Sequence, residues 1–169
     1  MTSTIRASIF ILAAFFLMAC GGRKGEASPQ AMLEQAQSLI DESRYADAIQ
    51  TLRKLVKTFP GDSTAARAQY MLGDTFMAYA KDFEQSVKEY RRVVAEHPQS
   101  RFAVNAQFMI GYIYANFIKD YDLAKAEYER FLEVFSDRAD SNLVQSVRFE
   151  LENLGKDLNE VPQLRHITS

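Results

Sequence analysis

The most chemically distinctive residue of this 169-residue chain is its single cysteine, Cys20, in the segment FLMACGG. One thiol cannot form an internal disulfide, and it cannot build a zinc site alone. Cys20 stands directly after an apolar stretch, so the question is whether it is a free thiol or the attachment point of a covalent group.

Few other side chains are candidates for catalysis, which needs reactive groups that converge. His97 precedes Pro98 at the expected end of a helix, where a cation suits the helix dipole, and His166 lies in the C-terminal tail. The segment GDST, with Asp62 and Ser63, resembles the nucleophile motif of one lipase family, but that motif should follow a strand. Here it opens a helix, so we interpret both residues as caps. A glycine-rich phosphate loop and metal-loop spacing are missing from the sequence. We therefore predict no enzyme activity, no metal site, no cofactor and no small-molecule substrate.

The composition indicates one globular domain with a substantial core. The chain is 47% hydrophobic and 25% charged, and its formal net charge is −2. Nucleic-acid binding normally requires a basic excess, so we expect no nucleic-acid partner. With 12 Phe and 8 Tyr but no Trp, aromatic packing should dominate the core.

The N-terminal segment, residues 1–19, has the layout of a secretory signal peptide. A polar start with Arg6 precedes the apolar run ASIFILAAFFLMA. This run is too short to span a bilayer as a mature helix, and it lacks the amphipathic period of a helix packed on a protein. The competing interpretation is a buried N-terminal helix.

The end of this segment, Leu17-Met18-Ala19-Cys20, resembles the lipobox of bacterial lipoproteins, although Met18 stands where a small residue is usual. The resemblance implies cleavage before Cys20, a diacylglyceryl group on its sulfur and an acyl chain such as palmitate on its amine. Two or three chains anchor a protein stably, whereas one does so only marginally. Residues 20–30 then read as a lipidated flexible tether. Gly21 replaces the aspartate that favours inner-membrane retention in enterobacterial lipoproteins, which implies an outer-membrane location, facing the periplasm.

The remainder of the chain contains an internal repeat. The segments YADAIQTLRKLVKTFP, FEQSVKEYRRVVAEHP and YDLAKAEYERFLEVFS begin at residues 45, 83 and 121, so both intervals are 38 residues. The segments AQYMLGDTF and AQFMIGYIY, from residues 68 and 106, repeat at the same interval. Apolar residues recur at helical spacing in each copy. Pro60 and Pro98 end two of these helices, and Ser63 and Ser100 are placed to cap the next ones.

These residues resemble the tetratricopeptide repeat (TPR), a pair of antiparallel helices. The second-helix pattern of the family matches three sets of positions: Ala48, Leu52, Leu55 and Pro60; Ser86, Tyr90, Val93 and Pro98; Ala124, Tyr128, Phe131 and Ser136. The first-helix pattern of the family matches Leu72-Gly73 with Phe76, Ile110-Gly111 with Tyr114, and Ala36 with Leu39. The small residues stand where the two helices of a pair cross closely, and the last two copies have a turn one residue longer than the family consensus.

The resemblance implies an all-α fold, a short right-handed solenoid of about three helix pairs with a C-terminal capping helix. We assign residues 31–155 to this TPR domain. Its repeats cover about residues 31–62, 63–99 and 100–138, and the capping helix covers residues 141–155. Residues 156–169 form a polar tail.

In such a solenoid the first helix of each pair lines the concave side. By the family pattern, the candidate partner-binding groove comprises Gln37, Tyr70, Asp74, Met77, Phe108, Tyr112 and Asn116. Aromatic and methionine side chains beside polar ones suit an extended or helical peptide. Tyr70 and Phe108 are alternatively core residues, whereas Asp74, Tyr112 and Asn116 are expected to be exposed.

A second surface carries basic residues on the outer sides of the second helices: Arg53, Lys54, Lys57, Arg91 and Arg92. We interpret these runs as solvated faces. The alternative is docking on anionic headgroups or on an acidic partner.

Among lipidated repeat proteins, the chain is similar to the repeat lipoprotein of the outer-membrane β-barrel assembly machinery. It is also similar to the repeat domain of a periplasmic coordinator associated with the Tol–Pal system. These resemblances imply a membrane-anchored, non-catalytic scaffold that binds envelope proteins or peptides, including those of the β-barrel assembly machinery, in outer-membrane protein assembly. The alternative is a periplasmic accessory factor for peptidoglycan remodelling or cell division. A carbohydrate role would require exposed rings at Phe108 and Tyr112.

Overall fold

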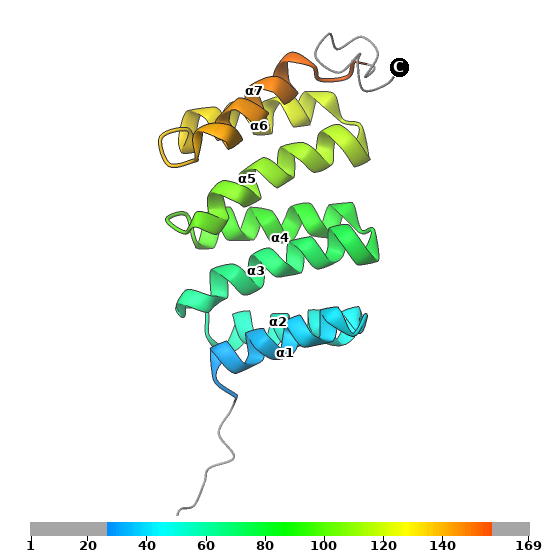
Figure 1. Cartoon of the computed structure of the whole chain (residues 1–169), viewed down its shortest axis with the longest axis vertical. Helices are drawn as coiled ribbons and strands as arrows, with labels where there is room; N and C mark the ends of the chain where they lie inside the picture. Colours follow the sequence, from blue (N-terminus) through cyan, green and yellow to red (C-terminus); the bar gives the residue numbers. More distant parts are fainter. Residues whose placement is uncertain (1–26, 157–169) are drawn as a thin grey trace, which may run out of the picture.

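The computed structural model describes residues 27–156, and within this range it contains helices and no strand (Figure 1). The all-α prediction is therefore confirmed. The helices are α1 (Pro29–Asp41), α2 (Tyr45–Thr58), α3 (Ser63–Thr75), α4 (Phe83–Glu96), α5 (Arg101–Ile113), α6 (Tyr121–Phe135) and α7 (Ser141–Glu152). The predicted signal peptide, Cys20, the first part of the predicted tether and residues 157–169 of the predicted tail lie outside the described range.

The helices form three antiparallel pairs stacked into an elongated solenoid, α1–α2, α3–α4 and α5–α6, with α7 at the C-terminal end (Figure 1). Each helix packs on the next one along the chain, and α3 also contacts the first helices on either side of it. This arrangement confirms the predicted TPR-like solenoid. It places the first helices in one layer and the second helices in another.

A glycine and a tyrosine fix the close crossing within the second and third pairs. A Cβ atom on Gly73 would lie 2.5 Å from Cε1 of Tyr90, and one on Gly111 would lie 2.6 Å from Cδ1 of Tyr128. Such distances are shorter than van der Waals contact, so a side chain at either glycine cannot coexist with the ring. The small residues predicted at the crossings are thus explained by the aromatic rings packed against them.

The core runs along the stack as two clusters of buried side chains. One joins α1 and α2 to α3, and the other extends from α4 to α7. The helix α7 has one fully buried side chain, Val147, while Leu143, Val144 and Leu151 are half-buried against the second cluster. It therefore covers the end of the last pair, as expected for a capping helix, although it ends at Glu152 rather than at residue 155.

At the starts of α3 and α5 the predicted caps Asp62 and Ser100 are confirmed, whereas the predicted cap Ser63 is not. The Ser100 hydroxyl accepts from the Ala103 N–H at 3.2 Å, as predicted. At α3 the cap is Asp62, whose carboxylate accepts from the Thr64 N–H at 2.8 Å, and Ser63 is the first helical residue. The prediction of Ser63 as a cap was therefore wrong, because the carboxylate one residue earlier reaches the free N–H groups.

The longer turns of the last two repeats are accommodated inside the helices. The helices α3 and α5 continue as five-residue π-helical segments, η1 (Phe76–Ala80) and η2 (Tyr114–Ile118). Each segment is ended by a lysine in the left-handed region, Lys81 at φ 54° and Lys119 at φ 63°. A π-helical turn takes up one additional residue, so the start of the second helix keeps its place.

Between residues 27 and 156, the helices lack the combination of length and apolar character needed to cross a membrane.

Candidate functional site

The predicted groove residues lie on the first helices and the π-helical segments that continue them. Tyr70 and Asp74 belong to α3 and Met77 to η1; Phe108 and Tyr112 belong to α5 and Asn116 to η2; Gln37 belongs to α1. Within α3 and α5 these residues are three or four positions apart, so they share one face of their helix. The structure thus brings them together as two short rows, with Gln37 apart on α1.

The first row centres on Asp74. The Tyr90 hydroxyl, from α4, donates a hydrogen bond to the Asp74 carboxylate, and the Tyr70 ring lies 5.2 Å from the Tyr90 ring. Burial raises the pKa of Asp74, and the hydrogen bond from Tyr90 opposes this effect in part. Asp74 is half-buried, so the expectation that it is freely exposed was wrong. Its carboxylate contacts Tyr90 of the same helix pair and is only partly exposed to solvent.

The second row is more aromatic. Phe108 lies 6.0 Å from Tyr112 and 6.1 Å from Tyr128, measured between ring centroids. Tyr112 also meets Phe117 edge-on at 5.9 Å, so its ring is half-buried and not exposed as expected. Asn116 is exposed, as expected, and its side-chain amide donates to the Tyr112 carbonyl at 3.1 Å.

The alternative interpretation of Tyr70 and Phe108 as core residues applies in part. Both side chains are half-buried and pack against the second core cluster, as does Met77. Tyr70 also lies 5.7 Å from the Phe102 ring on the next first helix. Tyr70 therefore joins neighbouring repeats, and all three side chains are only partly exposed at the surface.

Gln37 is fully exposed on α1, and its side-chain amide donates to Asp41 at 3.0 Å. Its hydrogen bond stays within one helix turn. The first pair thus presents a polar surface, whereas the second and third pairs present aromatic edges.

Beneath the second row is a buried hydroxyl that the sequence did not reveal. Tyr128 is completely buried, and among the described residues its hydroxyl has no hydrogen-bond partner. Burial raises its pKa, with a further contribution from the charge of Glu150 on α7. Glu150 is half-buried and its own pKa is raised by burial. The 38-residue interval was the available signal for Tyr128, because it makes this residue the counterpart of Tyr90.

A repeated polar pair joins the first helix to the second helix in the second and third pairs, and sequence reasoning also missed it. The Gln69 amide donates to Glu89, and the Gln107 amide donates to Glu127 at 2.8 Å, all four side chains being buried. Arg91 of α4 donates to Glu127 of α6 at 2.7 Å and so links successive second helices. Arg91 is therefore not only part of a solvated face.

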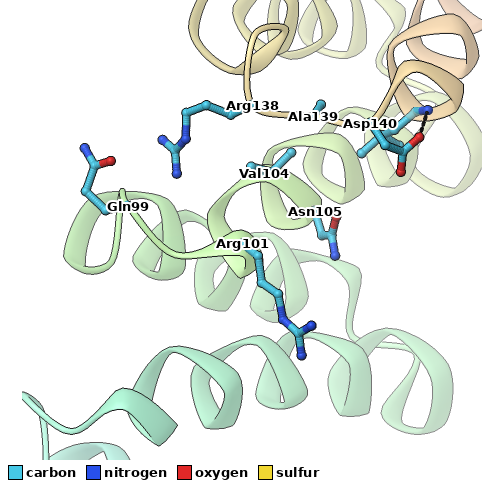
Figure 2. Close-up of a pocket in the computed structure, with 8 residues that line it drawn as sticks. Gln99, Arg101, Val104, Asn105, Arg138, Ala139 and Asp140 are labelled. Carbon is cyan, nitrogen blue, oxygen red and sulfur yellow. Dashed lines mark hydrogen bonds between the residues drawn. The ribbon is translucent and has the colours of Figure 1, made fainter.

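A polar hollow of about 390 Å³ lies where the α6–α7 connection passes the start of α5 (Figure 2). Arg138 and Gln99 border one side of it, while Arg101 points away from Arg138. Arg138 donates to the Pro98 carbonyl at 2.9 Å, and Asp140 caps α7. These groups serve the connections between helices, and the hollow holds no nucleophile beside a base.

The residues examined for catalysis have structural roles. Asp62 of the GDST segment accepts from the Thr64 N–H and hydroxyl, and these hydrogen bonds lower its pKa. His97 is the C-terminal cap residue of α4. Over residues 27–156, no group of three or more His, Cys, Asp and Glu side chains could hold a metal ion.

A protein-family model matches most of the described helices. The model of a protein family described as YfiO, outer membrane lipoprotein, matches residues 23–129, which include the first two helix pairs and most of the third. No curated protein matches the chain.

Proposed function

Because the chain belongs to the YfiO family of outer membrane lipoproteins, we propose that it is a lipid-anchored, non-catalytic scaffold. In this proposal the first-helix face binds a protein or peptide partner during assembly of the cell envelope, including its outer-membrane proteins. The β-barrel assembly machinery is the proposed destination, in accordance with the resemblance of the sequence.

The observation that carries the proposal is the pair of rows on α3–η1 and α5–η2. Each row places aromatic edges next to a polar group, Tyr70 next to Asp74 and Tyr112 next to Asn116. Backbone and side chains here are held by the second helices, so the surface is preorganised and ordering it on binding costs little entropy. A peptide that supplies apolar side chains and hydrogen-bond donors fits such a face.

The anchor is proposed to be a diacylglyceryl group on Cys20, with the described helices on the periplasmic side. The lipobox-like sequence and the family support it. No cofactor, metal ion or small-molecule substrate is part of the proposal, since the described polar groups cap helices or join repeats.

The peptidoglycan alternative gains no support from the aromatic rows. Stacking on a sugar needs an open ring face, but Phe108 and Tyr112 are both half-buried and contact each other. Peptide binding through ring edges is the better-supported function.

Site-specific photo-crosslinking in intact cells tests the proposal. A crosslinking residue at Asn116, exposed on the first-helix face, is expected to capture envelope proteins. The same residue at Lys125, exposed on α6, is the matched control and should capture far less. Equal capture from both positions, or none from Asn116, would contradict partner binding at this face.

The anchor is tested separately by Cys20→Ala. This variant should not receive the lipid and should leave the outer-membrane fraction. If its fractionation equals that of the unaltered protein, the anchor proposal is wrong whatever the crosslinking shows.

A further inference from the structure

The outer layer of second helices changes charge along the solenoid. The helix α2 contains three basic residues, Arg53, Lys54 and Lys57, and one acidic residue, Asp47, which gives a formal charge of +2. In α4 three basic and three acidic residues cancel. In α6 four acidic residues outnumber two basic ones, which gives a formal charge of −2. The acidic residues are Asp122, Glu127, Glu129 and Glu133, and the basic ones are Lys125 and Arg130. Positive charge is thus concentrated at the N-terminal end of this layer.

The cations of α2 also differ from those of α4 in their partners. Arg91 pairs with Glu127 at 2.7 Å, and Arg92 pairs with Glu96 at 3.0 Å. The ion pairs formed within residues 27–156 include none of the three cations of α2, although all three are exposed. These cations repel one another and remain available for an external anion.

Two of these cations line a hollow of about 410 Å³ between α2 and α4. Arg53 and Lys57 border it from α2 and Arg92 from α4. The Arg53 guanidinium lies over the Phe76 ring, 5.4 Å from its centroid, which restricts its orientation. Glu96, the acid at this hollow, is already paired with Arg92.

The equivalent hollow one repeat later provides an internal comparison. It has about 400 Å³ and lies between α4 and α6, with Ala95 in place of Lys57. Its Arg91, the counterpart of Arg53, is already bound to Glu127. The shape is repeated, but the first hollow is lined by two cations outside the ion pairs of the described residues, Arg53 and Lys57, whereas the second is lined by one, Arg130, beside the acid Glu127.

The location of these cations relative to the tether suggests what they bind. The helices α1 and α2 are antiparallel, so the start of α1 at Pro29 lies at the same end of the pair as Lys57, near the end of α2 (Figure 1). The nine residues from Cys20 to Pro29 can span at most about 30 Å. If Cys20 carries the proposed lipid, the start of α1 stays within about 30 Å of the membrane surface, so the positive end of α2 can reach that surface.

We propose that the cationic face of α2, formed by Arg53, Lys54 and Lys57, docks the protein on the phosphate groups of anionic phospholipids. Guanidinium and ammonium groups are the side chains that bind phosphate oxygens. Docking through α2 places the N-terminal pair at the bilayer, while the acidic α6 lies two helix pairs farther along the solenoid. The inference rests on the proposed anchor for its geometry, but its electrostatics are independent of the anchor.

Lysine protection on vesicles tests the proposal. The protein is extracted from its own membranes in detergent, with whatever modification it carries there, and is reconstituted into vesicles of phosphatidylethanolamine with phosphatidylglycerol, or of phosphatidylethanolamine with zwitterionic phosphatidylcholine. Exposed amines are labelled and quantified by mass spectrometry. Labelling of Lys54 and Lys57 should fall about fivefold on the anionic vesicles, the ratio that one bound cation supplies. Lys88 of α4 and Lys125 of α6 should label equally on both, and high salt should abolish the difference.

Two double variants with the same charge change are the controls. Arg53→Glu with Lys57→Glu should remove the protection of Lys54, whereas Lys88→Glu with Lys125→Glu should leave it intact. Helicity by circular dichroism shows that each variant is folded. Equal labelling of Lys54 and Lys57 on both vesicle types overturns the docking proposal, and an acidic protein partner then becomes the better explanation of this face.

The same experiment separates this inference from the anchor. If the protein washes off zwitterionic vesicles but stays on anionic ones in low salt, the anchor proposal fails and the docking proposal holds. If it stays on both and labels equally, the anchor holds and docking fails. If it washes off both, both proposals fail.

Discussion

The second and third helix pairs contain the same packing and different polar chemistry. Gly73 against Tyr90 is repeated as Gly111 against Tyr128, and the buried Gln69–Glu89 pair is repeated as Gln107–Glu127. The difference is at the first-helix face. Asp74 accepts a hydrogen bond from Tyr90, whereas the counterpart of Asp74 is Tyr112, and the described residues offer the Tyr128 hydroxyl no partner.

A second polar difference between the two pairs lies at the same helix crossing. Ser86 of α4 donates to the Gly73 carbonyl at 2.8 Å, and the corresponding residue of α6 is Ala124, which cannot donate. The glycine and the tyrosine that pack at the crossing are thus the same in both pairs, while the polar side chains around the crossing differ. The repeat unit specifies the scaffold, and the differences between units specify what each section of the face can bind.

The largest expected effect on stability comes from adding a side chain where the two helices of a pair cross closely. Gly73→Ala and Gly111→Ala should each destabilise the protein by about 1–3 kcal/mol, and leucine by more, because the Cβ atom collides with a buried tyrosine ring. This cost outweighs the gain of about 1 kcal/mol that alanine brings to a helix interior. Thermal unfolding followed by circular dichroism should show a fall of about 3 °C per kcal/mol.

Gly61→Ala is the matched control, since a Cβ atom there meets nothing within 4 Å. Its midpoint should equal that of the unaltered protein or exceed it slightly. If Gly73→Ala is equally harmless, the two crossings are not packed as described. If the two crossing variants differ widely, the similarity of the second and third pairs is only superficial.

The parts of the fold that followed from the sequence are those that repeat. The 38-residue interval and the spacing of the apolar residues were enough to predict the helix pairs and the small residues at their crossings. The interval could not show where an additional residue is absorbed, because a loop and a π-helical turn such as η1 satisfy the same spacing. The choice of Asp62 over Ser63 as a cap was equally hidden, since both side chains can accept an N–H.

The candidate site was less predictable than the fold for a physical reason. Assigning Asp74 and Tyr112 to the first-helix face is a matter of periodicity, but their exposure depends on residues from other elements. Tyr90 reaches Asp74 from α4, and Phe117 covers part of Tyr112 from η2. Glu150 comes from α7, which lies outside the repeated unit, so no internal comparison could have identified it.

A smaller effect sharpens the contrast between the two tyrosine hydroxyls. Tyr90→Phe removes the donor to a half-buried carboxylate and should cost about 1–2 kcal/mol. Tyr128→Phe removes a buried hydroxyl without a described partner and should not destabilise the protein, because the cost of burying that hydroxyl, about 1–3 kcal/mol, is removed with it. Urea unfolding monitored by circular dichroism measures both. Equal losses would mean that the Tyr128 hydroxyl has a partner after all, and that the two pairs are more alike than their described contacts.

The smallest effect is a pH dependence that comes from Asp74 of the second pair. Burial raises the pKa of Asp74 in the folded protein, so between its unfolded and folded pKa values the folded state binds more protons. The resulting stabilisation is complete below the unfolded pKa and is lost as the pH rises through the folded pKa. Asp74→Asn keeps an oxygen that can accept from Tyr90 but does not titrate. Relative to this variant, the unaltered protein should therefore gain stability on acidification, measured by urea unfolding at successive pH values from neutral downwards. Tyr112→Phe, at the equivalent position of the third pair, should give a curve parallel to that of the unaltered protein in this range, because a tyrosine hydroxyl stays protonated there. If the Asp74→Asn curve is also parallel, the Asp74 carboxylate is solvated well enough to behave like a surface acid, and the polar contrast between the pairs reduces to the Tyr90 hydrogen bond.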